Sequence, residues 1–395
     1  MGATARHARF GDATPMTATR QAAPGTLAAL VLASLFACGG FLGSSSADPG
    51  VPGPAPLIAV SVSPSTASTT AGGSVTFRAD VTGTTPGQST AVTWSVREAG
   101  GGSIGRATGV YSAPAAPGTF TVVATSVADG SRTGTATVTV AARAATVRDQ
   151  LAAMAKKRWF FAHMSVGSEI CGDYDPTGGR FTAPFGLAKL LADNAGSGLS
   201  VVRTTSAVEI PTGTFGNAQL NDAPLTGVNG DPASKMAAFQ AAMAGGLGNS
   251  VDLAFVKLGF VDQAMLFADR STRPAPGLSF KQYQDVMTAL QAAYPRTRFL
   301  HTTVSHSEAG AAYNNDQADN WNQMLRATYP ASEIFDVAWW DSHGAGGDLA
   351  TATANDGLAH PALHPDWAQA DGGHLNQAGA DMLARKLVEF LGTLQ

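Results

Sequence analysis

The chain has 395 residues, a length that suggests two or three domains. Hydrophobic residues make up 44% of it and charged residues 14%, which excludes a disordered protein and is sufficient to bury a core. The formal net charge is −4 and no run is rich in Lys or Arg, so the sequence excludes a basic nucleic-acid-binding surface, and we expect no nucleic-acid partner.

Residues 1–38 have the pattern of a signal peptide for export. The apolar run Leu27–Ala37 is too short to span a bilayer as a helix, and Arg20 supplies a positive flank. The run ends in Leu35-Phe-Ala-Cys38, which resembles the lipobox of bacterial lipoproteins, in which the cysteine is lipidated. We therefore expect a membrane anchor through a lipid on Cys38, and a protein of the bacterial cell envelope, lipid-anchored or secreted. The alternative is an ordinary signal peptide that is cleaved nearby.

A flexible linker and a small β module are predicted next. Residues 39–56 are rich in Gly, Ser and Pro, which is typical of a tether. Residues 57–142 contain short Val- and Thr-rich runs of period two, separated by Gly, Pro and Ser turns, which predicts a β-sandwich. The module resembles bacterial Ig-like domains in the runs Thr93-Trp-Ser-Val, Gly109-Val-Tyr-Ser-Ala-Pro and Gly118-Thr-Phe-Thr. We expect a spacer whose Trp94 and Tyr111 pack in the core; stacking of both rings on sugars is the alternative.

The remaining residues, 145–395, alternate between helical and strand patterns. Strands are predicted at 158–163, 200–203, 251–259, 298–305 and 334–340. Helices are predicted at 145–157, 185–194, 232–244, 280–294, 321–329 and 377–391. This alternation predicts an α/β fold with a mostly parallel sheet covered by helices on both faces, and a ligand site beyond the carboxyl ends of the strands.

Three side chains have the chemistry of a nucleophilic site. Ser165 follows the first predicted strand, where a strand–turn–helix junction exposes the hydroxyl and places the serine's own amide near a helix start. Asp371 and His374 lie three residues apart in a Gly-rich loop before the last predicted helix, so they can pair within one turn. The carboxylate would then orient the imidazole, whose other nitrogen is available to the serine.

These pieces resemble the first and last conserved blocks of SGNH (GDSL-like) hydrolases, and the resemblance covers Arg158–Leu391. It implies a three-layer α/β/α, flavodoxin-like fold. It also implies that Ser165 is the nucleophile, His374 the general base and Asp371 the residue that orients the base, with no cofactor. The middle strands of that fold are matched by Asp252-Leu-Ala-Phe-Val-Lys-Leu-Gly-Phe-Val-Asp262, His301-Thr-Thr-Val and Phe335-Asp-Val-Ala.

The sequence departs from that family at the oxyanion hole. The family's first block is usually Gly-Asp-Ser, whereas this chain has His163-Met-Ser165. Its third block is Gly-x-Asn-Asp, and here Val261 replaces the Asn, so that a hydrogen-bond donor worth about 3 kcal/mol is missing or supplied elsewhere. The backbone amide of Ser165 is one remaining donor. The other candidate oxyanion or substrate contacts are Gly167, Asn229, Gly230, Lys257, Gly259 and His163.

Two of these candidates each have a structural alternative. Lys257 interrupts a strand that is otherwise fully apolar, and a buried ammonium is costly unless it is paired. It either pairs with Asp262 or another carboxylate near the strand end, or it faces the pocket and holds an anionic group. His163 lies two residues before Ser165, so in an extended backbone its side chain should point to the same side as that of Ser165 and could contact the substrate. The alternative is that His163 makes a structural hydrogen bond to a neighbouring loop.

The sequence does not predict a metal site or a reactive thiol. The pairs His301/His306 and His360/His364 have no carboxylate at ligand spacing. Cys171 has no Cys-linked signature around it, so we expect a small, buried residue.

The pattern as a whole predicts an extracytoplasmic serine hydrolase that cleaves carboxylic esters through an acyl-serine intermediate. An O-acylated saccharide is the substrate that the expected location favours. Two alternatives stay open: an O-acyltransferase that uses the same three residues, and a catalytically degenerate surface lipoprotein for carbohydrate binding or adhesion. Val261 favours the degenerate protein, whereas the complete Ser/Asp/His set opposes it.

Overall fold

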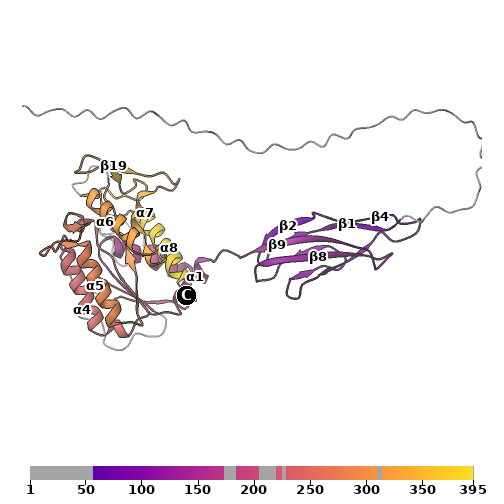
Figure 1. Ribbon diagram of the computed structural model, residues 1–395, viewed down its shortest axis with the longest axis horizontal. Coiled ribbons are helices and arrows are strands. Elements are labelled where there is room, and N and C mark those ends of the chain that lie inside the picture. Colours follow the sequence, from indigo (N-terminus) through magenta and orange to yellow (C-terminus); the bar gives the residue numbers. More distant parts are fainter. Residues whose placement is uncertain (1–56, 173–183, 204–218, 225–227, 309–313, 395) are drawn as a thin grey trace, which may run out of the picture.

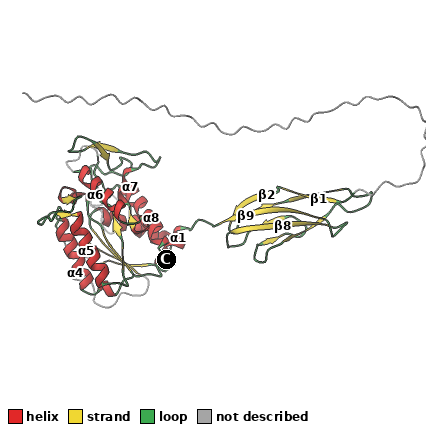
Figure 2. Ribbon diagram, viewed as in Figure 1, coloured by secondary structure: helices red, strands yellow, loops and turns green. Residues whose placement is uncertain are grey.

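The protein is of the mixed α/β class (Figures 1 and 2), with an all-β module followed by an α/β unit. The computed structural model describes residues 57–172, 184–203, 219–224, 228–308 and 314–394. The expected signal peptide, Cys38 and the linker therefore lie outside the described residues. Within these ranges, no helix has the length and apolar character needed to cross a bilayer.

The β module is built from short strands around one apolar core. Its strands are β1 (Ala59–Ser63), β2 (Thr66–Thr70), β3 (Ser74–Thr76), β4 (Arg78–Thr82), β5 (Val92–Val96), β6 (Ser103–Ile104), β7 (Val110–Ser112), β8 (Gly118–Ser126) and β9 (Thr133–Ala141). They form sheets of order β2-β9-β8-β5, β3-β7-β6 and β1-β4. Trp94 and Tyr111 are buried in the core, as expected, and the Tyr111 hydroxyl donates to the carbonyl of Gly101 at 2.7 Å.

The α/β unit begins at α1, whose start is fixed by a capping box between Thr146 and Asp149. Its helices are α1 (Val147–Met154), α2 (Val166–Cys171), α3 (Gly186–Asp193), α4 (Pro232–Ala244), α5 (Phe280–Ala293), α6 (Asn315–Thr328), α7 (Val337–Ser342) and α8 (Gln377–Thr393). Short 3-10 helices are η2 (Leu247–Asn249), η3 (Phe260–Met265) and η4 (Ala331–Glu333). Its strands are β10 (Trp159–His163), β11 (Ser200–Arg203), β12 (Gln219–Pro224), β13 (Leu253–Val256), β14 (Leu266–Phe267), β15 (Leu278–Ser279), β16 (Arg298–Phe299), β17 (His301–Thr302), β18 (Ile334–Phe335), β19 (Thr351–Thr353) and β20 (Ala359–Pro361).

A five-stranded sheet of order β11-β12-β10-β13-β16 forms the centre of this unit, and all of its strand pairs are parallel. Alternate residues of β10 enter two different cores. Phe160 and Ala162 pack with residues of α4, α5 and α6, whereas Trp159 and Phe161 pack with residues of α1, α3 and α8. The sheet therefore lies between two helical layers, which is why β10 and β13 are buried on both faces (Figure 1).

Several element boundaries differ from the sequence-based expectation. The structure has a strand, β12, that the sequence does not predict, because Gln219-Leu-Asn-Asp-Ala-Pro carries a single large apolar side chain. With β12 in place, the strand order by sequence is 2-3-1-4-5, whereas the flavodoxin-like order is 2-1-3-4-5. The strand expected at 334–340 ends at Phe335, because the Asp336 side chain accepts the N–H of Trp339 and caps α7.

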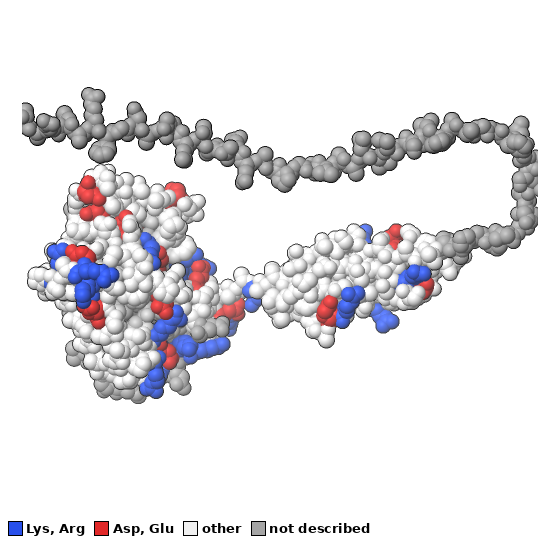
Figure 3. Space-filling view, viewed as in Figure 1, with Lys and Arg blue, Asp and Glu red and all other residues white. Residues whose placement is uncertain are grey.

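The surface carries charges of both signs. Figure 3 shows Lys and Arg interspersed with Asp and Glu on the visible face of both parts of the chain. Many of the charged side chains pair locally, as in Lys189 with Asp193 and Lys281 with Asp285, both one helical turn apart. Such exposed pairs add little to stability, so the fold depends mainly on the apolar core of the β module and the two apolar cores of the α/β unit.

A substitution of Leu387 on α8 would test how much the packing of α1, α3 and α8 contributes to the stability of the protein. The Leu387 side chain is fully buried, so Leu387→Ala should lower the free energy of unfolding by about 2–5 kcal/mol. The neighbouring exposed Arg385 provides the control, and Arg385→Ala should change stability by no more than about 0.5 kcal/mol. Urea unfolding followed by far-UV circular dichroism would measure both; equal effects would contradict the assignment of this core.

Candidate active site

Ser165, His374 and Asp371 form a continuous hydrogen-bonded chain at the carboxyl end of β10. Ser165 Oγ lies 2.8 Å from His374 Nε2, and His374 Nδ1 lies 2.6 Å from Asp371 Oδ2. Ser165 and His374 are separated by 209 residues in sequence, so only the fold brings them together. The three side chains are partly exposed to solvent, which leaves the serine hydroxyl accessible to a ligand.

Ser165 has an unusual backbone conformation, with φ 55° and ψ −117°. Among the described residues it is the one non-glycine residue with positive φ. Such a conformation costs about 1–3 kcal/mol and persists only where the surroundings enforce it. Here the Ser165 carbonyl accepts N–H groups from Ser168 at 2.8 Å and Glu169 at 3.1 Å, which fixes the start of α2. The strained turn between β10 and α2 directs the hydroxyl toward His374.

The loop that carries the other two side chains is also held in place. Asp371 Oδ1 accepts the N–H groups of Gly373 at 3.1 Å and of His374 at 3.0 Å. Burial opposes ionisation of Asp371, but these two N–H groups and the His374 ring together hold the pKa of this carboxyl below its usual range. A negatively charged Asp371 is therefore available to orient the imidazole.

Glu169 and Phe260 support His374, and the sequence analysis does not identify either. Glu169 is fully buried on α2, and its Oε2 accepts the N–H of Leu375 at 2.9 Å, which joins the serine helix to the histidine loop. The Phe260 ring meets the His374 ring edge-on at 5.2 Å between centroids. A side chain at Gly373 would lie 2.2 Å from the Phe260 ring, so this close approach requires glycine. The sequence signal that could have identified Glu169 is that it is the one charged residue in the otherwise uncharged segment Val166–Cys171.

The backbone donors expected for an oxyanion are mostly engaged within the protein. The N–H of Gly167 donates to the carbonyl of Met164, and the N–H groups of Gly230 and Gly259 both donate to Asp262. The expectation that these three glycines donate to an oxyanion is therefore wrong, because their N–H groups already have acceptors. Asn229 is exposed and its side chain has no hydrogen-bond partner among the described residues.

The Ser165 amide is the remaining backbone candidate for an oxyanion donor. Across the described ranges, no acceptor lies within hydrogen-bond distance of the Ser165 N–H. This amide belongs to the same residue as the hydroxyl that faces His374, so its distance from the reacting atom is set by the backbone of one residue.

His163 is a core residue in this structure, which corrects its assignment as a substrate contact. Its side chain is fully buried, with Nδ1 3.2 Å from Ser168 Oγ and its ring 4.9 Å from that of Phe161. A side chain at Gly167 would lie 2.4 Å from the His163 Cβ, so Gly167 serves to make room for the buried imidazole.

Lys257 is fully buried, and it does not pair with Asp262, which was one of the roles that the sequence left open. The Lys257 Nζ donates to the Leu258 carbonyl and to Ser305 Oγ, both at 3.2 Å, whereas Asp262 pairs with Lys235. Within the described part of the chain, no carboxylate forms an ion pair with Lys257. Burial lowers the pKa of Lys257 to about 8, against a smaller opposing effect of Asp341.

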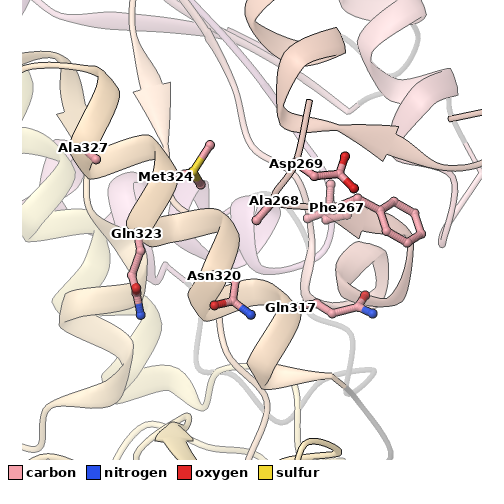
Figure 4. Close-up of a pocket in the computed structure, with 9 residues that line it drawn as sticks. Phe267, Ala268, Asp269, Gln317, Asn320, Gln323, Met324 and Ala327 are labelled. Carbon is pink, nitrogen blue, oxygen red and sulfur yellow. The ribbon is translucent and has the colours of Figure 1, made fainter. Parts of the chain in front are cut away.

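A separate hollow of about 550 Å³ lies between β14 and α6 (Figure 4). Phe267 and Asp269 line one side, and Gln317, Asn320 and Met324 of α6 line the other. The lining includes none of the three side chains at the carboxyl end of β10. In the ranges that the structure describes, no three His, Cys, Asp or Glu side chains are grouped so that they could hold a metal ion.

Comparisons with known proteins give little further information. No protein-family model matches the chain, and a search of curated proteins finds no match. A solved structure from Streptococcus pneumonia, provisionally described as a platelet activating factor, matches 62% of this chain and 91% of its own at 14% identity, with a TM-score of 0.31. A likeness of this extent carries no argument about function.

The buried ammonium of Lys257 makes stability depend on pH. Its pKa is about 8 in the folded protein and 10.5 when exposed, so the unfolded state binds more protons between these values and stability rises with pH across this window. Relative to Lys257→Met, the wild type should gain about 3 kcal/mol between pH 7 and pH 10.5.

Urea unfolding of both proteins at the two pH values would measure this gain. At pH 7 the variant should be the more stable protein, because it buries no charge. A difference between the two proteins that does not change with pH would contradict the assignment.

Proposed function

We propose that the protein hydrolyses carboxylic esters through an acyl-serine intermediate on Ser165. The observation that supports this proposal is the hydrogen-bonded chain from Ser165 Oγ through His374 to Asp371, with distances of 2.8 Å and 2.6 Å. In this proposal the chain is an SGNH-type hydrolase, although its strand order differs from the flavodoxin-like order at β12.

His374 acts as the general base. Its Nε2 takes the proton of the Ser165 hydroxyl while Oγ attacks the carbonyl carbon of the ester. Asp371 holds the ring through Nδ1 and stabilises the imidazolium that forms. The Asp371 carboxylate suits this role because the N–H groups around it keep its pKa low. His374 then protonates the leaving alcohol, and a water molecule, activated by the same ring, releases the acid.

The tetrahedral intermediate needs donors for its negatively charged oxygen. We assign one to the backbone N–H of Ser165, which has no acceptor among the described residues. The side chain of Asn229 is the remaining candidate from the sequence, because the N–H groups of Gly167, Gly230 and Gly259 are engaged. A site with one backbone donor and one side-chain donor would be a weaker catalyst than one with three, by about 3 kcal/mol for each lost donor.

Replacing the nucleophile tests the proposal directly. Ser165→Ala should lower the turnover of p-nitrophenyl acetate by a factor on the order of 10⁴ or more, and should abolish labelling by a fluorophosphonate. Ser271→Ala is the control, since Ser271 is exposed and its hydroxyl donates to Asp269 at 2.7 Å, away from the three site residues. Wild-type protein that is not labelled, or a Ser165→Ala variant as active as the wild type, would favour the catalytically degenerate binding protein instead.

We further propose that the enzyme acts in the bacterial cell envelope on an O-acylated saccharide. The Ig-like β module would serve as a spacer between a lipid anchor on Cys38 and the α/β unit. An O-acyltransferase differs only in the acceptor, a sugar hydroxyl in place of water, and product analysis with a saccharide acceptor separates the two reactions.

The anchor is tested by metabolic labelling with a palmitate analogue. The wild type should be labelled and recovered with membranes, whereas Cys38→Ala should be unlabelled and released, because the thioether to the lipid can no longer form. Cys171→Ala is the matched control, since Cys171 is buried and should not be lipidated. Membrane-bound Cys38→Ala protein would contradict the anchor.

A further inference from the structure

Lys235 and Asp262 form a fully buried ion pair near the candidate active site. Lys235 Nζ of α4 lies 2.9 Å from Oδ1 and 2.8 Å from Oδ2 of Asp262, which belongs to η3. The two side chains are 1% and 0% exposed, so the pair is removed from water. Burying both charges is costly, and a hydrophobic pair of similar volume often stabilises a fold equally well. The pair therefore requires a reason beyond stability.

Asp262 also fixes two backbone N–H groups. Oδ1 accepts the N–H of Gly230 at 3.1 Å, and Oδ2 accepts the N–H of Gly259 at 2.7 Å. One carboxylate thus joins two parts of the chain that are distant in sequence: the turn Val228–Gly230 with the helix α4 that follows it, and the segment Gly259–Val261 that precedes Asp262. We call Lys235 and Asp262 the clamp. A hydrophobic pair in their place could fill the volume, but it could not accept either N–H group.

One of the segments held by the clamp contacts the candidate active site, and the other lies beside it. In the loop Gly259–Val261, the Phe260 ring lies edge-on against His374 at 5.2 Å. The turn Val228–Gly230 is next to this loop, because a side chain at Gly230 would lie 3.7 Å from the carbonyl oxygen of Val261. The turn exposes Asn229, whose side chain has no hydrogen-bond partner among the described residues.

We propose that Lys235 and Asp262 are positioning residues of the ester hydrolysis, and that they act by holding the turn with Asn229 against the loop beside His374. This inference rests on the function proposed above. The carboxamide of Asn229 then supplies the donor that Val261 cannot, and the clamp determines where that donor lies. A donor for the oxyanion is effective only if it is fixed before the reaction, which explains why a buried charge pair is retained at this place.

The test uses variants of the full-length protein that keep the buried volume. Lys235→Met with Asp262→Leu removes both charges together, so that no unpaired charge remains. Arg298→Met with Glu333→Gln is the control for removing an ion pair away from the site. Arg298 begins β16, at the amino end of the sheet and opposite the carboxyl ends where Ser165 lies, and it pairs at 3.0 Å with Glu333; both side chains are partly exposed. Lys235→Met with Asp262→Asn keeps the shape of the Asp262 side chain and one acceptor and leaves no charge unpaired, so this second variant replaces the first if the first does not fold.

The clamp variant should lose kcat, and it should be less stable than the wild type because the N–H groups of Gly230 and Gly259 lose their acceptor. We expect kcat for p-nitrophenyl acetate to fall by about 10- to 100-fold, with a change in KM of less than about threefold, because orientation and not ground-state binding is affected. Lys235→Met with Asp262→Asn should show a smaller loss in the same direction. The Arg298/Glu333 control should keep the wild-type kcat. Either of the two Lys235/Asp262 variants that folds and has wild-type kcat would overturn the inference.

A double-mutant cycle then tests the route through the turn. Asn229→Ala should lower kcat in the wild-type background, but it should have almost no further effect in the clamp variant, because the misplaced carboxamide no longer contributes there. Losses that multiply would show that the clamp does not act through Asn229. Absence of Ser165-dependent turnover in the wild type would instead contradict the hydrolase proposal itself, and the inference with it.

Discussion

The parallel pairing of β10 with β13 is the constraint on which the candidate site depends. Both strands are buried between two helical layers, so their register is set by apolar side chains on both faces. Parallel strands end at the same edge of a sheet. The chain segments that follow β10 and β13 are therefore adjacent: the first carries Ser165, and the second carries the loop Gly259–Val261 that packs beside His374.

The site is held by contacts between different elements of the fold. The strained backbone of Ser165 is enforced by the first turn of α2, and Glu169 of that helix also binds the N–H of Leu375. The free energy stored in the turn is small compared with that of the apolar packing of β10 and α8 on either side. The fold can therefore retain an unfavourable conformation at the one residue whose hydroxyl must be exposed.

Two buried lysines illustrate how the surroundings decide the state of a charge. Lys235 has a carboxylate partner, and the pair connects the turn Val228–Gly230 and α4 with the segment Gly259–Asp262. Lys257 has only neutral acceptors, the Leu258 carbonyl and Ser305 Oγ, and burial lowers its pKa to about 8. Lys235 forms a structural clamp, whereas the burial of Lys257 is costly and we do not assign it to the chemistry.

The sequence by itself determined the α/β class and the positions of most helices, because periodicity and strand–turn–helix signals are local. It also indicated Ser165, Asp371 and His374 as the residues of a candidate site. Only the tertiary structure decided which acceptors the N–H groups of Gly230 and Gly259 find, and which lysine Asp262 binds. These partners are far apart in sequence, 27 residues for Lys235 and Asp262 and 32 for Gly230 and Asp262. A hydrogen bond depends on approach to about 3 Å, which local pattern does not encode.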